Sequence, residues 1–416
     1  MDVLAIAFNH DPLSARTSAL NLRQNQTRFV TVPEWQRGLP AASPVAYAIA
    51  DTAGSTISIR AKLAIPEHAE ATVEIRAIPA PAPPIPESVV LAAAPPWALT
   101  PLEYAIARWY LEVAWRQQWG LNADILGEVA ATPVEVLADG TTDFAEFKLV
   151  STRLQERGVG AHRASWLWQC RTGEGRPWRD ITTTSHQVYT LITVPTAPWV
   201  QFPYDSDNTQ LPWAEVLEWA CMWAAGSTTP EVAASAINVA VYEFGAARLD
   251  YGCLNGAPSN YSYPAFDCTA FLQRLRDGFG NGPFVNCSDC ATIVSTFANS
   301  VGCDLWQAQM FDSLQAFPVN PVKVIGDTAF RPVCGIGLFN YHEVAWTDAC
   351  DVDDQVFDAC LEVGLLAPFE PTIPLLPSNL TFGRPGSGGY RDRLAAPAGR
   401  LLCRPRPESR TRRFVY

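Results

Sequence analysis

The chain has 416 residues, of which 48% are hydrophobic and 17% are charged. This composition excludes a largely disordered protein, and the length suits two or three folded domains. The formal net charge of −12 argues against a nucleic-acid-binding protein, because phosphate contacts need a basic surface, and no apolar stretch reaches the ~20 residues of a membrane span.

The first residues, MDVLAIAFNHD, lack the basic start and the long apolar run of a signal peptide. We therefore expect the protein to be cytoplasmic at synthesis, with non-classical export or assembly into a particle as the remaining routes elsewhere. The eleven cysteines are odd in number, and without a signal peptide we expect reduced thiols rather than disulfides.

Short strands are predicted throughout residues 1–92. Segments that are rich in β-branched residues, or that alternate in polarity, are separated by Asp, Pro, Gly and Ser clusters typical of turns. These segments cover residues 3–8, 27–32, 45–50, 56–65 and 71–78. The spacing predicts a β-sandwich domain, and the proline-rich run 78–87 is predicted to be a stiff linker at its end.

Residues 93–202 carry a second set of strand signals. The pattern at 101–118 fits either a helix or a pair of strands, because many of its apolar residues are aromatic. The later segments alternate more clearly, and Trp166 and Trp168 are predicted to share one buried face. We predict a second β-rich, sandwich-like domain with strands at residues 133–139, 145–151, 164–170 and 186–194.

Helices precede strands in residues 203–370, which is typical of an α+β domain. Strand-like alternation begins at Trp306 and continues to residue 363. Proline, N-capping and glycine signals predict four helices, at residues 212–225, after Thr229, at residues 266–277 and after Asn286.

Residues 371–416 form a basic tail that is broken by proline and glycine. From Arg384 onward, nine arginines face only two acidic residues, which gives this part a net charge of about +7. Its low apolar content predicts a solvated or disordered segment. The alternative is a strap that docks on an acidic surface of this chain or of another subunit.

The stretch VNCSDCATIVSTFANSVGCDL, residues 285–305, contains the best candidate nucleophile. Asn286 is a good N-cap and Asp289 can complete a capping box, so Cys287 lies in the first turn of a helix with an apolar face. Free backbone N–H groups and the helix dipole there favour a thiolate. A single cysteine is more often a small buried hydrophobic residue, so Cys287 needs partners.

Two downstream residues supply such partners. His342 lies in the strand-like segment NYHEVAWT, and Asp358 follows in QVFDACLEV. Neighbouring antiparallel strands can place an imidazole beside a carboxylate, which would give a nucleophile, a base and a group that orients the base. We therefore predict a catalytic triad of Cys287, His342 and Asp358.

These residues resemble the transglutaminase-like cysteine hydrolase superfamily over roughly the last two-fifths of the chain. The family's nucleophile motif has counterparts in Cys287, Asp289, Ala291 and Gly302, and its following His and Asp correspond to the other two predicted residues. The resemblance implies a papain- or transglutaminase-like α+β domain. It also implies a cysteine-dependent peptidase, amidase or transglutaminase that acts on protein or peptide amides. Thiol chemistry itself implies no cofactor or metal, and the residues do not support a calcium site.

Three alternatives compete for the same residues. PAFDCTAFLQRL imitates the nucleophile segment of NlpC-like cell-wall peptidases, with Cys268 as nucleophile and His342 as base. Cys287 and Cys290 form a CxxC that could be half of a zinc site. The last alternative is a structural or adaptor protein that retains the fold without turnover and contacts other subunits through its β-domains or basic tail.

A thiol enzyme also needs donors for the oxyanion that forms on the substrate carbonyl. The backbone N–H of Cys287 is the expected first donor. Candidates for the second are Asn286, Trp306 and Tyr341, although Asn286 is also expected to be occupied as a cap and Trp306 to lie in the core.

Overall fold

The computed structural model describes residues 1–39, 42–69, 71–80, 124–195, 211–253, 258–364 and 378–416. The chain folds as two compact units, Met1–Val194 and Pro195–Tyr416. Within the described ranges, no helix combines the length and the apolar character needed to cross a membrane.

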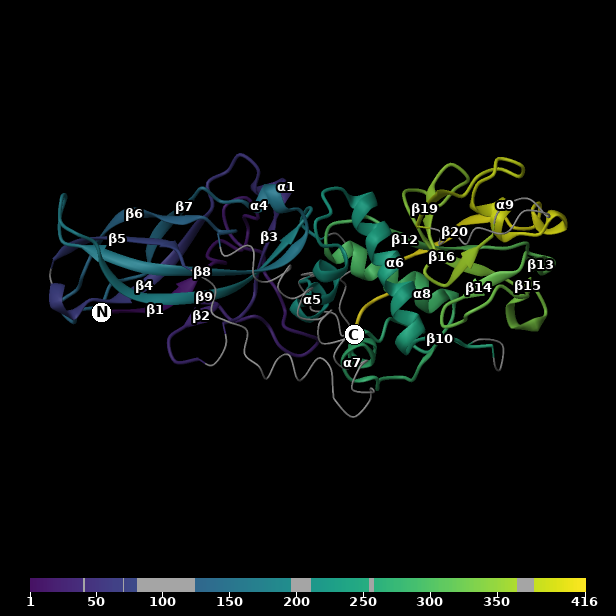
Figure 1. Ribbon diagram of the computed structural model, residues 1–416, viewed down its shortest axis with the longest axis horizontal. Helices are drawn as coiled ribbons and strands as arrows, with labels where there is room; N and C mark the ends of the chain where they lie inside the picture. Colours follow the sequence, from purple (N-terminus) through teal and green to yellow (C-terminus); the bar gives the residue numbers. More distant parts are fainter. Residues whose placement is uncertain (40–41, 70, 81–123, 196–210, 254–257, 365–377) are drawn as a thin grey trace. The chain divides into compact units, whose positions relative to one another are not determined.

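The first unit is built on one nine-stranded sheet that curls around a shared core (Figure 1). The strand order is β2-β1-β4-β7-β6-β5-β8-β9-β3, and all pairs are antiparallel except β3 with β9. Its strands are β1 (Asp2–Ala7), β2 (Trp35–Gln36), β3 (Val45–Ala48), β4 (Ser58–Ala64), β5 (Thr72–Pro79), β6 (Glu128–Glu135), β7 (Ala145–Val150), β8 (Gly160–Arg171) and β9 (Arg179–Leu191). Short helical turns lie at α1 (Ile49–Thr52), η1 (Pro66–His68) and α4 (Leu154–Arg157).

This sheet corrects the predicted boundary between residues 92 and 93. Strand β4 pairs with β7, and β5 pairs with both β6 and β8, so strands from both predicted modules alternate in one sheet. Side chains from both parts also share one buried core. Alternating polarity shows which face of a strand is buried, but not which strand lies beside it.

Other parts of the first unit differ from the prediction locally. Residues 27–32 form no strand, and only an isolated bridge joins Arg23 to Phe29. The predicted element at 101–118 and most of the linker at 78–87 lie outside the described residues.

Strand β8 supplies the aromatic centre of this core. Trp166 and Trp168 are fully buried, as the alternation predicted. The indole N–H of Trp166 donates to the carbonyl of Gly127 at 2.8 Å, and its ring stacks on Phe8 with a centroid separation of 5.9 Å. The satisfied N–H group allows a large polar-tipped ring to lie in the interior without an unpaired donor.

The helices of the second unit agree with the four that the sequence predicts. Pro230 begins α6 and Gly278 ends α7 in a left-handed conformation. The bounds are α5 (Ala214–Trp223), α6 (Pro230–Arg248), α7 (Cys268–Asp277) and α8 (Cys287–Ser300). Every residue of α8 is buried, which makes it the central helix of this unit.

The second unit carries a five-stranded antiparallel sheet of order β19-β17-β16-β12-β20. Its strands are β12 (Trp306–Met310), β16 (His342–Trp346), β17 (Gln355–Phe357), β19 (Ser378–Thr381) and β20 (Pro405–Thr411). Within the stretch from Trp306 to residue 363 that was predicted to be strand-like, residues 333–335 instead form a 3₁₀ turn, η3 (Val333–Gly335).

Short two-stranded pairs surround this sheet. β10 (Asp250–Tyr251) runs parallel to β11 (Phe284–Val285). The other two pairs are antiparallel, and they join β13 (Phe317–Pro318) to β15 (Leu338–Phe339) and β14 (Val322–Val324) to β18 (Leu361–Val363).

The described part of the C-terminal segment is folded, which corrects the predicted solvated tail. It contributes β19 and β20 to the sheet, together with α9 (Tyr390–Leu394) and η4 (Pro397–Gly399). Its arginines pair with acids of the same unit, for example Arg412 with Asp304. Arginine stems and paired guanidinium groups can cover a protein's own surface, so a high positive charge does not by itself predict disorder.

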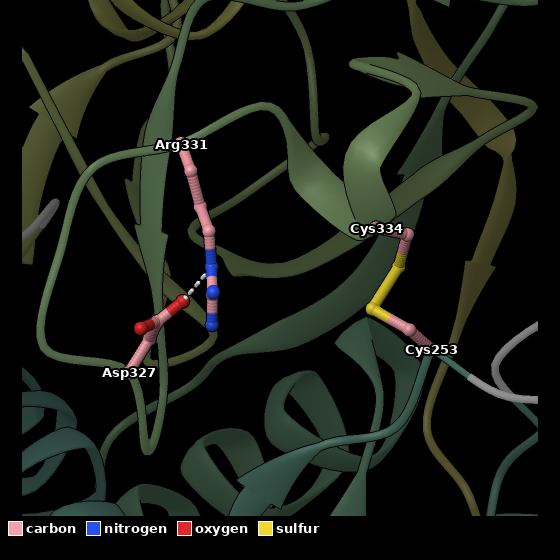
Figure 2. Close-up of a disulfide and its surroundings, with 4 residues drawn as sticks. All are labelled: Cys253, Asp327, Arg331 and Cys334. Atoms are coloured by element: carbon pink, nitrogen blue, oxygen red, sulfur yellow. Dashed lines mark ion pairs between the residues drawn. A yellow bond between two sulfur atoms is a disulfide. The ribbon is translucent and has the colours of Figure 1, made fainter.

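One disulfide corrects the expectation of reduced thiols. Cys253, just after β10, is bonded to Cys334 in η3, and both residues are exposed (Figure 2). The other nine cysteines are free and buried.

The buried indole in β8 gives a first prediction. Trp166→Ala should lower the free energy of unfolding by about 3–5 kcal/mol, because it leaves a cavity and an unpaired carbonyl. Denaturant unfolding followed by circular dichroism measures this loss. The matched control is Trp178→Ala, because Trp178 is only half-buried and stacks on Arg76 and Arg171. Equal losses in the two variants would contradict the assignment of Trp166 to the core.

Candidate functional site

The candidate nucleophile Cys287 is the first residue of α8, directly after β11. Asn286 caps the helix by accepting the N–H of Asp289 at 2.9 Å, and Asp289 accepts the N–H of Asn286 at 3.2 Å. This is the predicted capping box with Asp289 as its acidic partner. It fixes the helix start, so the position of Cys287 is set by local hydrogen bonds.

The carboxylate of Asp289 also binds the backbone of a neighbouring loop. Oδ1 accepts the N–H groups of Tyr261 and Ser262 at 3.0 and 2.8 Å, and Oδ2 accepts that of Asn260 at 3.0 Å. Burial raises the pKa of Asp289, while these N–H groups act to lower it. The side chain therefore joins the loop at residues 260–262 to the turn that carries Cys287.

His342 and Asp358 meet as predicted. Nε2 of His342, the first residue of β16, lies 2.9 Å from Oδ2 of Asp358, which follows the last residue of β17. Asp358 also accepts the hydroxyl of Tyr390 at 2.7 Å and the N–H of Cys360 at 2.8 Å. Three donors around one carboxylate hold it in a fixed orientation toward the imidazole.

The electrostatics of His342 link the three predicted residues. Burial acts to lower the pKa of His342, but the charge and hydrogen bond of Asp358 outweigh it, and the Cys287 thiol adds to the rise, to about 10. Nδ1 is buried and has no partner of standard hydrogen-bond geometry among the described residues, so it is the ring nitrogen left for the thiol.

The site is enclosed. The exposed fractions are 4% for Cys287, 0% for His342 and 2% for Asp358. Phe339 stacks on the imidazole with a centroid separation of 4.8 Å. Tyr251 is also buried, and its raised pKa follows first from burial and then from nearby groups that include Cys360 and Cys287. A substrate carbonyl can reach the sulfur only if part of this enclosure moves.

Tyr251 also lines a cavity of about 410 Å³. Tyr251 and Gly326 line it together with the charged residues Asp250, Asp327 and Arg331. The Cys253–Cys334 disulfide forms part of its wall, close to the Asp327–Arg331 ion pair (Figure 2). Tyr251 is thus the side chain shared by the cavity and the surroundings of Cys287.

The competing cysteines have different surroundings. Cys268 begins α7, is fully buried, and has a pKa raised by burial and by Asp267. Its electrostatic neighbours are Asp267, Glu215 and Arg276, whereas those of His342 are Asp358 and Cys287. For the zinc hypothesis, no group of three His, Cys, Asp or Glu side chains suited to a metal occurs in the described part of the chain.

The three candidate oxyanion donors differ in whether their polar groups are already occupied. Asn286 is occupied as the cap and exchanges hydrogen bonds with Ser259. Trp306 is covered by the guanidinium groups of Arg410 and Arg412, at 3.6 and 3.7 Å from the ring centroid. Tyr341 remains, because its hydroxyl lies 3.4 Å from Oγ of Ser288 and its pKa is raised by burial and by Cys287.

Sequence reasoning missed Tyr390 and Glu343. Tyr390 lies in the segment predicted to be a solvated tail, and its hydroxyl contact with Asp358 joins residues 32 positions apart. Glu343 directly follows His342, but strand alternation would place it on the solvent side, whereas it is 1% exposed. Neither position carries a local signal that could have identified it.

No protein-family model matches the chain, and no curated protein matches it. Among solved structures, it is similar to the crystal structure of red sea bream transglutaminase, at 10% sequence identity and a TM-score of 0.33. The match covers 74% of this chain and 48% of that one, so the chain spans about half the length of the fish protein. A TM-score this low supports no conclusion about the chemistry of the site.

The raised pKa of His342 predicts a loss of stability at alkaline pH. Its contribution to the free energy of unfolding is complete below the ordinary value of 6.5 and is lost as the pH rises to about 10. The advantage of wild type over His342→Gln should therefore shrink across this range, by at most about 1.4 kcal/mol per pH unit. Urea unfolding at several pH values measures it.

His186→Gln is the matched control. Burial lowers the pKa of His186 to about 3, so its contribution changes on the acid side only. The difference between wild type and His186→Gln should stay level above pH 6.5. If the His342→Gln difference were equally level, the imidazolium–carboxylate pair would not exist in the folded protein.

Proposed function

We propose that the protein is a cysteine-dependent hydrolase or acyltransferase that acts on peptide-type amide bonds through Cys287, His342 and Asp358. The supporting observation is the buried 2.9 Å contact between His342 and Asp358, and the Cys287 thiol contributes to the raised pKa of the same imidazole. These three groups have the chemistry of a nucleophile, a general base and an orienting carboxylate.

The proposed reaction has two steps. His342, whose pKa is raised to about 10, holds the proton that it shares with the thiol; the sulfur of Cys287 attacks the amide carbonyl, and the carbon–nitrogen bond breaks as His342 gives that proton to the leaving amine. The resulting thioester is then attacked by water, which gives an acid, or by a primary amine, which gives a new amide. The helix dipole at the start of α8 stabilises negative charge that develops at this position.

Asp358 orients the imidazole in this scheme. Its hydrogen bond to Nε2 directs Nδ1 toward the thiol, and Tyr390 and the Cys360 N–H hold the carboxylate in place. No cofactor or metal is required by thiol chemistry of this kind. The transglutaminase-like assignment and a protein or peptide substrate belong to the same proposal.

Alkylation tests the nucleophile directly. With limiting iodoacetamide near pH 6.5, we expect Cys287 to be labelled before the other eight free cysteines, as measured by peptide mass spectrometry. Burial raises the pKa of most of them, Cys268 among them. His342→Ala should slow the labelling of Cys287 by about tenfold or more. Faster labelling at Cys268 would instead favour the cell-wall peptidase hypothesis.

The acyl acceptor can be identified with a labelled amine. The protein is incubated with a glutamine-rich peptide and a fluorescent primary amine, and the products are separated by mass. Incorporation of the amine identifies a transferase, whereas conversion of amide to acid identifies a hydrolase. Cys287→Ala should abolish either product, and a product that survives this substitution would rule out the proposed nucleophile.

The enclosure of the site favours a second candidate, a structural or adaptor protein. All three proposed residues are at least 96% buried, so they could also be a satisfied polar cluster in a core. In that case Cys287 should be labelled as slowly as the other buried cysteines, and His342→Ala should lower stability without changing the order of labelling.

A further inference from the structure

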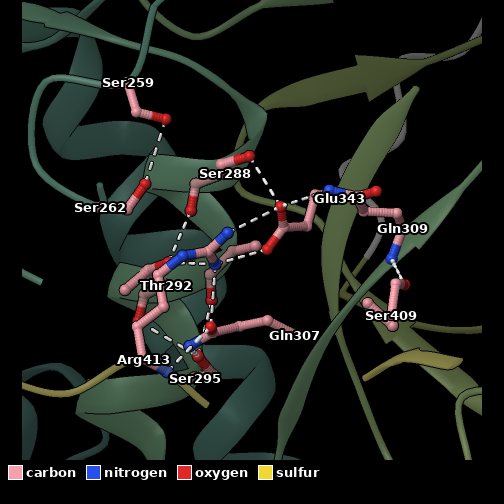
Figure 3. A network of polar contacts seen from close by, with 12 residues as sticks. Ser259, Ser262, Ser288, Thr292, Ser295, Gln307, Gln309, Glu343, Ser409 and Arg413 are labelled. Carbon is pink, nitrogen blue, oxygen red and sulfur yellow. Dashed lines mark hydrogen bonds and ion pairs between the residues drawn. The ribbon is translucent and has the colours of Figure 1, made fainter. Parts of the chain in front are cut away.

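A polar seam lies between α8 and the sheet that carries His342. Oγ of Ser288 donates to Oε2 of Glu343 at 2.7 Å, and Nη2 of Arg413 donates to the same oxygen at 3.0 Å (Figure 3). On the helix side, Ser288, Thr292 and Ser295 occupy positions i, i+4 and i+7, so they lie on one face of α8. They contact strands β12 and β16 and the C-terminal segment. The members of the seam are Ser288, Thr292, Ser295, Gln307, Glu343 and Arg413.

We propose that this seam sets the register of α8 against β16, and so acts as the positioning device for the Cys287–His342 pair. This inference rests on the proposed function. Ser288 directly follows Cys287, and Glu343 directly follows His342. The 2.7 Å bond therefore ties the two backbones together one residue beyond each reacting group.

The seam allows a single register of α8 against β16 because its polar groups are buried. Glu343 is 1% exposed and Ser288 is 4% exposed, so each polar group must keep its partner or lose free energy. An apolar interface tolerates small shifts of a helix along a sheet, whereas a directional network has one satisfied register. A shift of one helical step would separate Ser288 from Glu343 and leave a buried carboxylate without its hydroxyl donor.

Arg413 neutralises the charge of the buried Glu343 carboxylate by forming an ion pair with it. Burial acts to lower the pKa of Arg413, but Glu343 outweighs this effect and the net change is upward. Its Nη1 also donates to Thr292 and to Gln307, each at 2.9 Å. The same guanidinium thus joins the helix, strand β12 and strand β16, and it comes from the segment that follows β20.

The seam is distinct from the residues that would touch a substrate. None of its members belongs to the proposed triad, and the hydrogen bonds of Asp358 go to Tyr390 and Cys360 rather than to Glu343. Replacing the seam should therefore change how the triad is aligned without removing any reacting group.

The decisive variant replaces the buried ion pair with apolar residues of similar size, as Glu343→Leu combined with Arg413→Met. Such replacements often leave stability unchanged, and the partners that lose a contact, Ser288 and Gln307, are uncharged side chains, so the melting temperature should fall little if at all. Labelling of Cys287 by iodoacetamide should slow by about tenfold, because a displacement near 1 Å is enough to impair a reacting pair. In this background His342→Ala should cause little further slowing, since the two groups are no longer aligned.

The matched control is Arg406→Met combined with Glu408→Leu. These residues form an ion pair on β20, and the Glu408 side chain is 67% exposed. The control makes the same chemical exchange in the same segment and should leave Cys287 labelling unchanged. If the Glu343→Leu, Arg413→Met protein does not fold, Ser288→Ala removes only the direct link and should produce a smaller slowing in the same assay.

The outcomes separate the two proposals. If His342→Ala slows labelling equally in wild type and in the seam variant, the seam does not position the pair, and the proposed function stands. If His342→Ala has no effect on wild type, the proposed function itself fails. A seam variant that labels as fast as wild type at an unchanged melting temperature would overturn the register proposal alone.

Discussion

The second unit depends on a helix that has no solvent-exposed side. All fourteen residues of α8 are buried, although they include Ser, Thr, Asn and Asp as well as apolar side chains. Each polar group on such a helix must find a partner inside the protein, because an unpaired buried group costs about 1–3 kcal/mol. The surrounding loops, strands and C-terminal segment supply most of these partners, although Oγ1 of Thr296 has none among the described residues.

Three buried carboxylates illustrate how differently that requirement is met. Asp289 is surrounded by backbone N–H groups, Glu343 is paired with Arg413, and Asp358 is paired with His342 and Tyr390. Among these partners, the His342 imidazole is the group whose ordinary pKa lies nearest to neutral pH, and the pairing with Asp358 raises it. Asp289 and Glu343 thus hold backbone and arginine groups in place, whereas Asp358 holds an imidazole, which is the group that the proposed function uses.

Local features of this unit were predictable from the sequence, and distant ones were not. The capping box at Asn286 and Asp289 and the glycine end of α7 involve residues within four positions, so their signals are complete in a short window. His342 and Asp358 were predictable because antiparallel strands bring alternate residues together. The contacts of Tyr390 and Arg413 come from a segment whose composition indicated disorder, and they depend on folding across 32 to 121 positions.

The first unit shows the same limit for strands. The buried face of β8 follows from its own alternation, but the pairing of β5 with both β6 and β8 does not. Any two strands with one apolar face are acceptable neighbours in a core, and the choice is made by how loops and side-chain volumes fit together. Most of the predicted strands are therefore present, but they belong to one sheet and not to two separate modules.

Enclosure and reactivity place opposite demands on the site. Removing water strengthens the attraction between His342 and Asp358 and sharpens the orientation of the imidazole. The same enclosure keeps a substrate away from a thiol that is 4% exposed. Tyr251 is one link between the site and its surroundings, because it lines a cavity of about 410 Å³ and also interacts electrostatically with Cys287. On the proposed function, a substrate reaches Cys287 only if part of this enclosure moves, while the Ser288–Glu343 hydrogen bond holds the start of α8 against β16.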